Sequence, residues 1–314
     1  MLNTKEIKRR KKSISNIGQI TKAMEVVAVN KMRKSQKIAL ETRPYVYEAM
    51  GILKTISQRT EPSSSYFLRE KPPGKIAVLL ITSDKGLCAG LNTSLFRQTE
   101  ELLLKFHGRP LDFVVIGKKG VEWCERKKLN VLKSFFGFGD YIDFKETAPV
   151  SEFIIELFKD KKWEAIWAVY TNFLSALKQK VTAKMILPLK EKGLKEIIAS
   201  IVPTYGRFAN NRGLFSVIIE DRPLAEFKWN FEYKFEPDIG IILDDLLYNL
   251  TQIEIYYLVL ESNASEHSAR RLAMKNASDN AEKIIKDLSL LYNKARQTMI
   301  TQEINEITAA SELL

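Results

Sequence analysis

The segment from Ile241 to the C-terminus carries apolar side chains at the spacing of a coiled-coil helix. Two series repeat every seven residues, one from Leu243 and one from Leu246, and such heptads are typical of helices that pack side by side. The segment contains neither glycine nor proline. At about 1.5 Å per residue it predicts a rod roughly 105 Å long, several times the usual helix length in a globular domain. The seam positions are Leu243, Leu250, Tyr257, Ala264, Arg271, Ser278, Ile285, Tyr292 and Met299 in one series, and Leu246, Ile253, Leu260, His267, Met274, Ala281, Leu288 and Ala295 in the other.

Residues 1–60 carry a second helical pattern with a shorter apolar seam. They contain one proline and two glycines, and so few helix-breaking residues favour one long helix. Because the rest of the chain connects the end of this helix to the start of the other, the two helices are expected to pack antiparallel. The shorter seam consists of Ile7, Ile14, Ile17, Met24 and Ala28, widened by Ile20 and Val27.

The prolines and glycines concentrate between the two helical segments. Residues 62–240 hold nine of the ten prolines and twelve of the fourteen glycines, so this part of the chain turns often. Short apolar runs alternate there with helical patterns, which predicts a small, open, mostly parallel sheet of Rossmann-like type. The predicted strands are Lys75–Thr82, Leu111–Gly117, Glu164–Thr171 and Lys180–Leu187, with Val150–Asp160 as a crossover helix.

The predicted fold class is therefore α/β with long helices. An antiparallel coiled coil of the N- and C-terminal helices is joined to a central, open, mostly parallel α/β domain. Three parts are expected: the N-terminal helix at 1–60, the central domain at 75–240 with an irregular insertion at 190–227, and the C-terminal helix at 241–314.

The charge of the chain is concentrated on the N-terminal helix. The chain has 49 basic and 38 acidic residues and a net charge of +11. Residues 1–40 contain eleven Lys or Arg and two acids, hence a local charge of +9. Such a face is either simply solvated or complementary to an acidic partner, and the charge alone leaves open whether that partner is protein or nucleic acid.

Catalytic chemistry is not evident in the residue pattern. The turn Ser83–Asn92 follows a predicted strand and precedes a helix, but it matches neither common phosphate-binding glycine motif. The two cysteines, Cys88 and Cys124, exclude a disulfide framework and favour a reducing compartment. His107 and His267 lie in helical patterns and are interpreted as structural. The sequence predicts no catalytic residue, no metal site and no cofactor, and it contains no apolar run long enough to span a membrane.

The C-terminal end is apolar on more than one side. A free helix end of this kind would normally aggregate, so either another protein covers it or it folds against its own domain. The residues concerned are Met299, Ile300, Ile304, Ile307, Ala309, Ala310, Leu313 and Leu314.

Four segments resemble the gamma subunits of F-type ATP synthases. Ile17–Gln36 is similar to the N-terminal signature helix of that family, and Ser265–Ile307 is similar to its C-terminal signature almost throughout. Ser83–Asn92 resembles a turn of its central domain, and Phe231–Asp238 resembles the entry to its rotor foot. One departure is the sequence Ala309–Ser311, where the family commonly has a glycine step.

The resemblance implies a non-catalytic rotor shaft. Its rod would lie in the central cavity of three alpha and three beta subunits, and its foot would rest on the c ring beside epsilon. The shaft would couple proton-driven rotation to ATP synthesis or hydrolysis on other chains. The resemblance further implies a peripheral complex on the cytoplasmic side of the cell inner membrane, with no cofactor, no nucleic acid and no thiol switch.

The resemblance also assigns roles to individual residues. The beta-subunit catch would be formed by Arg296, Gln297, Thr301 and Glu303. The N-terminal contacts to acidic beta loops would be Lys22, Met24, Lys31 and Arg33; the apolar bearing at the tip Met299, Ile300, Ile304 and Ile307; and the foot contacts to the c ring and epsilon Phe235, Glu236 and Asp238.

Two other functions stay open on the residues alone. One is an α/β nucleotide-binding enzyme with a coiled-coil oligomerisation arm, binding at Ser83–Asn92. The other is a basic coiled-coil scaffold for nucleic acid, whose affinity would depend steeply on salt.

Overall fold

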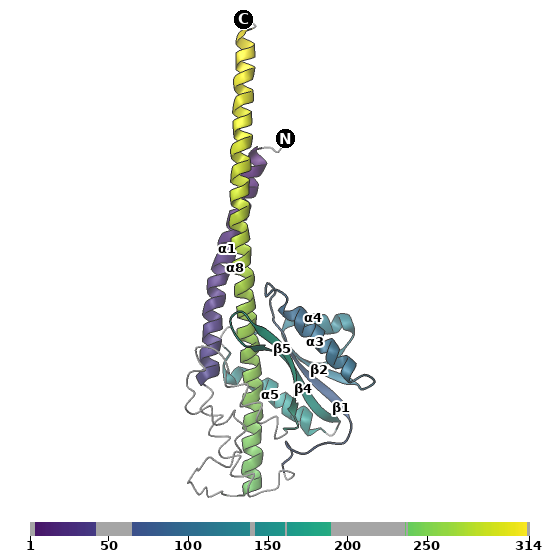
Figure 1. Ribbon diagram of the computed structural model, residues 1–314. Coiled ribbons are helices and arrows are strands. Elements are labelled where there is room, and N and C mark those ends of the chain that lie inside the picture. The colour runs from purple at the N-terminus through teal and green to yellow at the C-terminus, as the bar shows by residue number, and fades with distance from the viewer. Residues whose placement is uncertain are drawn as a thin grey trace. The chain divides into compact units, whose positions relative to one another are not determined.

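The computed structural model describes residues 4–41, 65–138, 142–160, 162–189, 236 and 238–312 (Figure 1). The expected insertion at 190–227 and the expected foot residue Phe235 lie outside these residues. By packing, the chain divides into two compact units, one formed by Met1–Val29 with Arg270–Leu314 and the other by Asn30–Ala269.

Two long helices are shared between these units. α1 extends over Thr4–Glu41, and α8 extends over Ile239–Glu312, a continuous helix of 74 residues. Both long helices were predicted; residues 42–60 of the expected N-terminal helix lie outside the described residues, and α8 begins two residues earlier than its pattern indicated. None of the helices in the described part of the chain is long and apolar enough to cross a membrane.

The larger unit contains a five-stranded sheet. Its strands are β1 (Lys75–Ile81), β2 (Leu111–Ile116), β3 (Asn130–Phe135), β4 (Trp163–Phe173) and β5 (Gln179–Leu187). The order across the sheet is β3-β2-β1-β4-β5, with β5 antiparallel to β4 and every other pair parallel. The mostly parallel sheet is confirmed, and one strand, β3, was not predicted.

Helices cover both faces of this sheet. On one face lie α3 (Leu91–Lys105) and α4 (Lys118–Lys127), whose buried side chains pack on Val78, Leu80 and Val115. On the other face lies α5 (Phe144–Lys159), which begins six residues before the predicted start and contains Pro149. Because both faces are covered, the central strands are continuous apolar runs rather than alternating ones.

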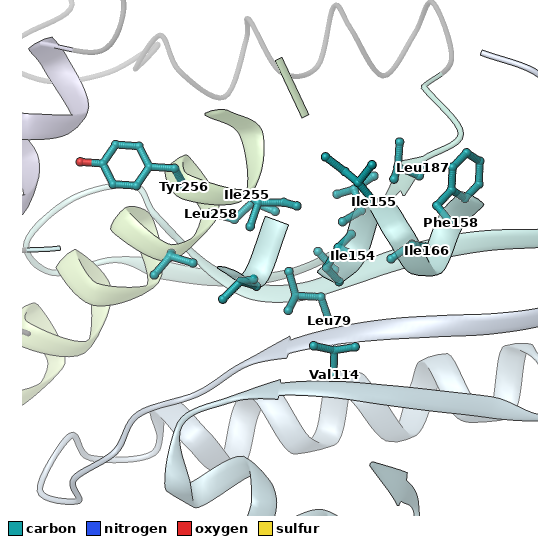
Figure 2. Packing of buried hydrophobic residues seen from close by; sticks show 14 of the residues in the cluster. Leu79, Val114, Ile154, Ile155, Phe158, Ile166, Leu187, Ile255, Tyr256 and Leu258 are labelled. Atoms are coloured by element: carbon teal, nitrogen blue, oxygen red, sulfur yellow. The ribbon is translucent and has the colours of Figure 1, made fainter. Parts of the chain in front are cut away.

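The first third of α8 belongs to the same core as α5. Figure 2 shows Ile255 and Leu258 of α8 near Ile154 and Ile155 of α5, over the strand residue Leu79. Every residue from 250 to 262 is buried. The predicted seam residues of this stretch therefore pack against a globular core, which corrects the expectation that the heptads serve a coiled coil along the whole helix.

The smaller unit is an antiparallel pair of helical segments. Thr21 Oγ1 lies 2.8 Å from Ser278 Oγ, and Thr4 Oγ1 lies 3.5 Å from Met299 Sδ. Lower numbers on α1 thus meet higher numbers on α8, as predicted. A Cβ added to Gly18 would lie 3.3 Å from the Cβ of Ala281, so the two backbones approach closely at this point.

Small residues, rather than the predicted branched ones, form the centre of this seam. Thr21 and Ala28 are buried, whereas Ile17 is 48% exposed and Ile20 and Val27 are also exposed. The assignment of Ile17 to the seam, and of Ile20 and Val27 to its margin, was therefore wrong. The close approach at Gly18 turns the helix so that its small residues face the partner.

Candidate functional site

Polar groups of the turn Ser83–Asn92 form hydrogen bonds within the chain. Asn92 Nδ2 donates to Ser83 Oγ at 2.7 Å, and Asn92 Oδ1 accepts from Ser83 N at 3.3 Å. The carboxylate of Asp84 accepts from the backbone N–H groups of Lys118 and Gly137, each at 3.0 Å. These bonds tie together the loops that follow β1, β2 and β3, which is the work of a structural turn.

A glycine after β2 brings helix α4 close to this turn. Gly117 has φ +95, and a Cβ there would lie 2.2 Å from the carbonyl oxygen of Thr82. The hydroxyl of Thr82 also accepts from Gly120 N at 2.9 Å. The backbone at Gly117 therefore fills the space beside the end of β1. The turn has the position of a phosphate-binding loop, between a strand and a helix, but not its glycine motif.

The cysteines and histidines do not form a reactive centre in the described residues. Cys88 and Cys124 are buried free thiols, and burial raises the pKa of the Cys124 thiol to about 11, which keeps it protonated. Among the described residues no group of His, Cys, Asp or Glu is arranged to hold a metal ion. His267 is buried within α8, and His107 lies exposed just after α3.

The predicted catch residues share the exposed C-terminal part of α8. Arg296, Gln297, Thr301 and Glu303 are all exposed, and the Thr301 hydroxyl donates to the Gln297 carbonyl at 2.9 Å. At about 100° per residue, Arg296 and Glu303 lie on nearly the same line along the helix. Their polar ends are thus presented to solvent together.

The predicted bearing residues lie on the same stretch and are equally uncovered. The exposed fractions of these side chains range from 43% at Ile300 to 70% at Ile307, with Met299 and Ile304 between these values. Every side chain described from 296 to 308 is exposed. An isolated helix with isoleucines on its surface gains nothing from them in water, so this end of α8 is built to be covered.

The predicted contacts on α1 fall on different faces of the helix. Lys22 and Met24 are two residues apart, and so are Lys31 and Arg33, which separates the members of each pair by about 200° around the axis. Lys22 Nζ donates to Glu25 Oε2 at 3.0 Å, and this hydrogen bond and the charge of Glu25 raise the pKa of Lys22. Met24 and Lys31 are half-buried, whereas Arg33 is exposed.

An apolar face of α1 was missed as a surface. Ile17, Ile20 and Val27 are exposed and, with Met24, recur at three- and four-residue intervals along one side of the helix. The sequence signal was present, because the run of apolar residues is wider than one partner helix can cover. The prediction that the whole run belongs to the seam is wrong for these exposed residues.

The two described foot residues are exposed, and one of them has a structural role. Asp238 Oδ1 accepts from Gly240 N at 2.7 Å and from Ile241 N at 3.3 Å. It therefore caps the first turn of α8, whose leading N–H groups have no partner within the helix. Glu236 lies just before this cap.

An antiparallel pair of helical segments, an exposed apolar end of α8 and a small, mostly parallel sheet define an α/β protein with long paired helices. Sequence comparisons identify the family to which this chain belongs. A model of the ATP synthase family matches residues 3–314, and the ATP synthase gamma chain of Opitutus terrae is 38% identical over 310 residues, covering 99% of this chain and 98% of the relative. The chain belongs to the ATP synthase gamma chain family.

Further relatives and solved structures agree with this assignment. Gamma chains from Dehalococcoides mccartyi and Legionella pneumophila are 35% and 31% identical, each covering the whole of both chains. A chain of the Euglena gracilis mitochondrial ATP synthase rotor has a TM-score of 0.58 at 16% identity, covering 95% of this chain and 98% of its own. A central-stalk chain from Tetrahymena thermophila has a TM-score of 0.55 at 22% identity, covering 82% of this chain and 99% of its own. At these identities the two structures support the fold alone.

Proposed function

We propose that this chain is the central rotor shaft of an F-type ATP synthase, coupling rotation of a c ring to ATP synthesis or hydrolysis on alpha and beta subunits. The observation that carries the proposal is the uncovered end of α8, with Ile300, Ile304 and Ile307 exposed on a lone helix, in a chain that matches gamma chains over its full length. A ring of foreign subunits would cover this end.

The chain itself is a non-catalytic subunit in this proposal. A shaft shifts the conformations of its partners only through contacts that differ from one partner to the next. The smaller unit is suited to this, because α1 presents an apolar side and a separate basic residue, Lys22, while α8 presents a different set of side chains. Each orientation within a three-fold ring of alpha and beta subunits would thus give three different sets of contacts.

The individual contacts follow the roles expected from the family resemblance. Arg296, Gln297, Thr301 and Glu303 would engage a beta-subunit loop, and the apolar bearing residues on the same stretch of α8 would turn with few directional bonds to break. On α1 the contacts to acidic beta loops, which would attract the basic side chains, would be made by Lys22, Met24, Lys31 and Arg33. The exposed side of α1 around Ile17 and Ile20 adds an apolar contact to this set.

The far end of the shaft would face the membrane sector. Glu236 and Asp238, at the start of α8, would meet the c ring and epsilon, together with Phe235. This arrangement would make the chain a peripheral component on the cytoplasmic side of the cell inner membrane, bound there through its partners.

Co-purification tests the proposal directly. The full chain, tagged at its N-terminus and expressed with the alpha and beta subunits of the same source, should co-purify with both and support ATP hydrolysis with a rotating probe attached to the exposed Lys128. A chain that leaves alpha and beta unbound, or an assembled complex that hydrolyses ATP without rotation, contradicts the proposal. Titration of the isolated chain with ATP separates the enzyme alternative, for which micromolar binding at Ser83–Asn92 is required.

A further inference from the structure

Polar side chains of α8 reach the sheet of the larger unit along one face of the helix. Glu254, Ser262, Ser265 and Ser268 contact β4, β5 or the turn between them. At about 100° per residue these four positions lie within roughly 120° of the helix circumference, and they extend over about 21 Å of its length. Helix-on-sheet packing is normally apolar, so a polar line of this length requires an explanation.

Two of the serines bind backbone groups of Thr171, which lies beyond the pairing of β4 with β1 although β5 still pairs with it on the other side. The last residue of β4 paired with β1 is Val169, opposite Leu80, and Thr171 lies beyond this pairing. The N–H of Thr171 donates to Ser262 Oγ at 3.3 Å, and its C=O accepts from Ser265 Oγ at 3.1 Å. The helix therefore takes the place of a neighbouring strand at this point.

The third serine holds the turn that joins β4 and β5. Ser268 Oγ donates to the carbonyl of Ala176 at 2.7 Å and accepts from Gln179 Nε2 at 3.3 Å. Hydrogen bonds weaken steeply when the donor and acceptor are displaced or misaligned. A rotation of α8 about its axis would thus break the contacts of Ser268 to the turn at Ala176 and to the start of β5 at Gln179.

A buried ion pair continues the same line. Lys184 Nζ on β5 lies 2.9 Å from Glu254 Oε1, and the two side chains are only 12% and 4% exposed. Lys184 also lies over the ring of Tyr170, 5.9 Å from its centre. Moving Glu254 away would leave a buried charge without its partner, which is strongly unfavourable.

The apolar contacts of α8 do not fix its rotation in the same way. Leu250 to Ser262 are buried on every side of the helix, and the attraction between apolar surfaces has no preferred direction. A helix surrounded by apolar side chains is held in place, but its orientation about its own axis depends on directional contacts. In the larger unit the polar face described above supplies such contacts along about 21 Å of the helix, and Tyr256 adds one on another side, where its hydroxyl donates to the carbonyl of Ile142 at 3.1 Å.

We propose that Lys184, Glu254, Ser262, Ser265 and Ser268 are positioning residues that form a torsional lock between α8 and the sheet. The inference rests on the proposed function as a shaft, because it assigns to these residues the transfer of twist from the globular part to the helix. α8 continues without a break past Ala269, where the larger unit ends. The lock lies directly before that point and therefore determines how much of an applied twist enters the rest of the helix.

Two lock variants and one control variant separate this role from simple stability. Lys184→Met with Glu254→Met replaces the ion pair by apolar side chains of similar length, which proteins often tolerate. Ser262→Ala with Ser265→Ala removes the bonds to Thr171. The control, Ile255→Val, weakens the apolar packing of the same helix and leaves the lock intact. Urea midpoints of all three chains establish how much stability each has lost.

The first measurement is local and uses the isolated full chain. Nitroxide labels on the exposed positions Lys180 and Asn249 report the distance between β5 and α8 by pulsed electron paramagnetic resonance. We expect the distance distribution to be at least twofold wider in both lock variants and unchanged in the control variant at a comparable loss of stability. The single variant Ser268→Ala, at the edge of the lock, serves if a double variant does not fold.

The second measurement uses the complex with alpha and beta subunits. We expect the torsional stiffness between the globular part and the subunit ring, obtained from the angular fluctuations of a stalled probe, to fall at least twofold in the lock variants. Wild-type stiffness and wild-type distance widths in every folded lock variant would overturn the lock. A wild-type complex that does not rotate would instead overturn the proposed function and leave the distance measurement to decide on the lock.

Discussion

The carboxyl group of Glu261 makes the stability of the larger unit depend on pH in an unusual direction. Glu261 lies on α8 and is 6% exposed. Burial raises its pKa to about 8, although a hydrogen bond with Tyr257 and the charge of Lys184 act in the opposite direction. One of its oxygens has no hydrogen-bond partner among the described residues. The neutral acid is therefore the favoured form in the folded chain at neutral pH.

The sign of the effect follows from proton binding. Between pH 4.5 and 8 the folded chain holds a proton on Glu261 that the unfolded chain has released, so the free energy of unfolding falls as the pH rises through this range. Below it both states are protonated and the stabilisation is complete, and above it both are ionised. The difference between pKa values of 8 and 4.5 corresponds to about 5 kcal/mol, of which about 3 kcal/mol is lost between pH 5 and pH 8.

The variant Glu261→Gln removes the titration and keeps the shape of the side chain. We expect its free energy of unfolding to change less with pH than that of the wild type, with the difference between the two chains shifting by about 3 kcal/mol from pH 5 to pH 8 in favour of the glutamine chain. Urea denaturation followed by tryptophan fluorescence is the assay, because Trp123, Trp163 and Trp167 all lie in the larger unit.

A matched control removes the same charge from an exposed position of the same helix. Asp245→Asn should give a nearly constant difference from the wild type at every pH. If the curves of wild type and Glu261→Gln run parallel from pH 5 to pH 8, then Glu261 is not held neutral by its surroundings and the reasoning from its burial is refuted.

Three further predictions concern the helices. Arg296→Ala with Gln297→Ala should lower ATP turnover of the assembled complex several-fold while assembly persists, whereas alanines at the exposed Arg97 and the half-buried Gln98 of α3 should leave turnover unchanged; equal turnover in both would remove the first pair from the catch. Gly18→Leu should destabilise the smaller unit by about 1–3 kcal/mol in thermal melts followed by circular dichroism, because its Cβ would already lie 3.3 Å from Ala281, and an unchanged melt would show that the seam is looser than described. Asp238→Ala should lose about 1 kcal/mol of helix capping, seen as faster hydrogen exchange in the first turn of α8, and Asp238→Asn should restore the protection.

The sequence was most informative where burial is complete. Strands β1, β2 and β4 are continuous apolar runs, because both faces of the sheet are covered, and each was predicted within a few residues. β3 was missed because it is an edge strand in which Lys133 and Ser134 interrupt the pattern. The early start of α5 was missed because a proline such as Pro149 normally indicates the end or the start of a helix.

The faces of the long helices were harder to predict. A heptad pattern shows that a helix is covered, but it does not say by what, and the first third of α8 is covered by α5 and the sheet rather than by a second rod. The predicted seam of α1 includes Ile7 and Ala28, which are buried, but it was wrong at Ile17, because the close approach at Gly18 brings Thr21 into the seam instead. The pairing of Lys184 with Glu254 joins positions 70 residues apart, and no local pattern connects them. The catch, bearing and foot residues remain predictions.

The contact between Thr21 and Ser278 has a consequence for how the two long helices find each other. Their hydroxyl groups are buried and satisfy one another only in a single alignment. If either helix of the pair slipped by one turn, the Ser278 hydroxyl would lose this buried partner, at a cost of about 1–3 kcal/mol, whereas the Thr21 hydroxyl would keep its hydrogen bond to the Gly18 carbonyl at 3.0 Å. A seam of small residues alone would allow the two helices to slide along each other. The hydrogen bond between Thr21 and Ser278 therefore fixes the alignment of α1 against α8, and with it the length of α8 that extends beyond α1.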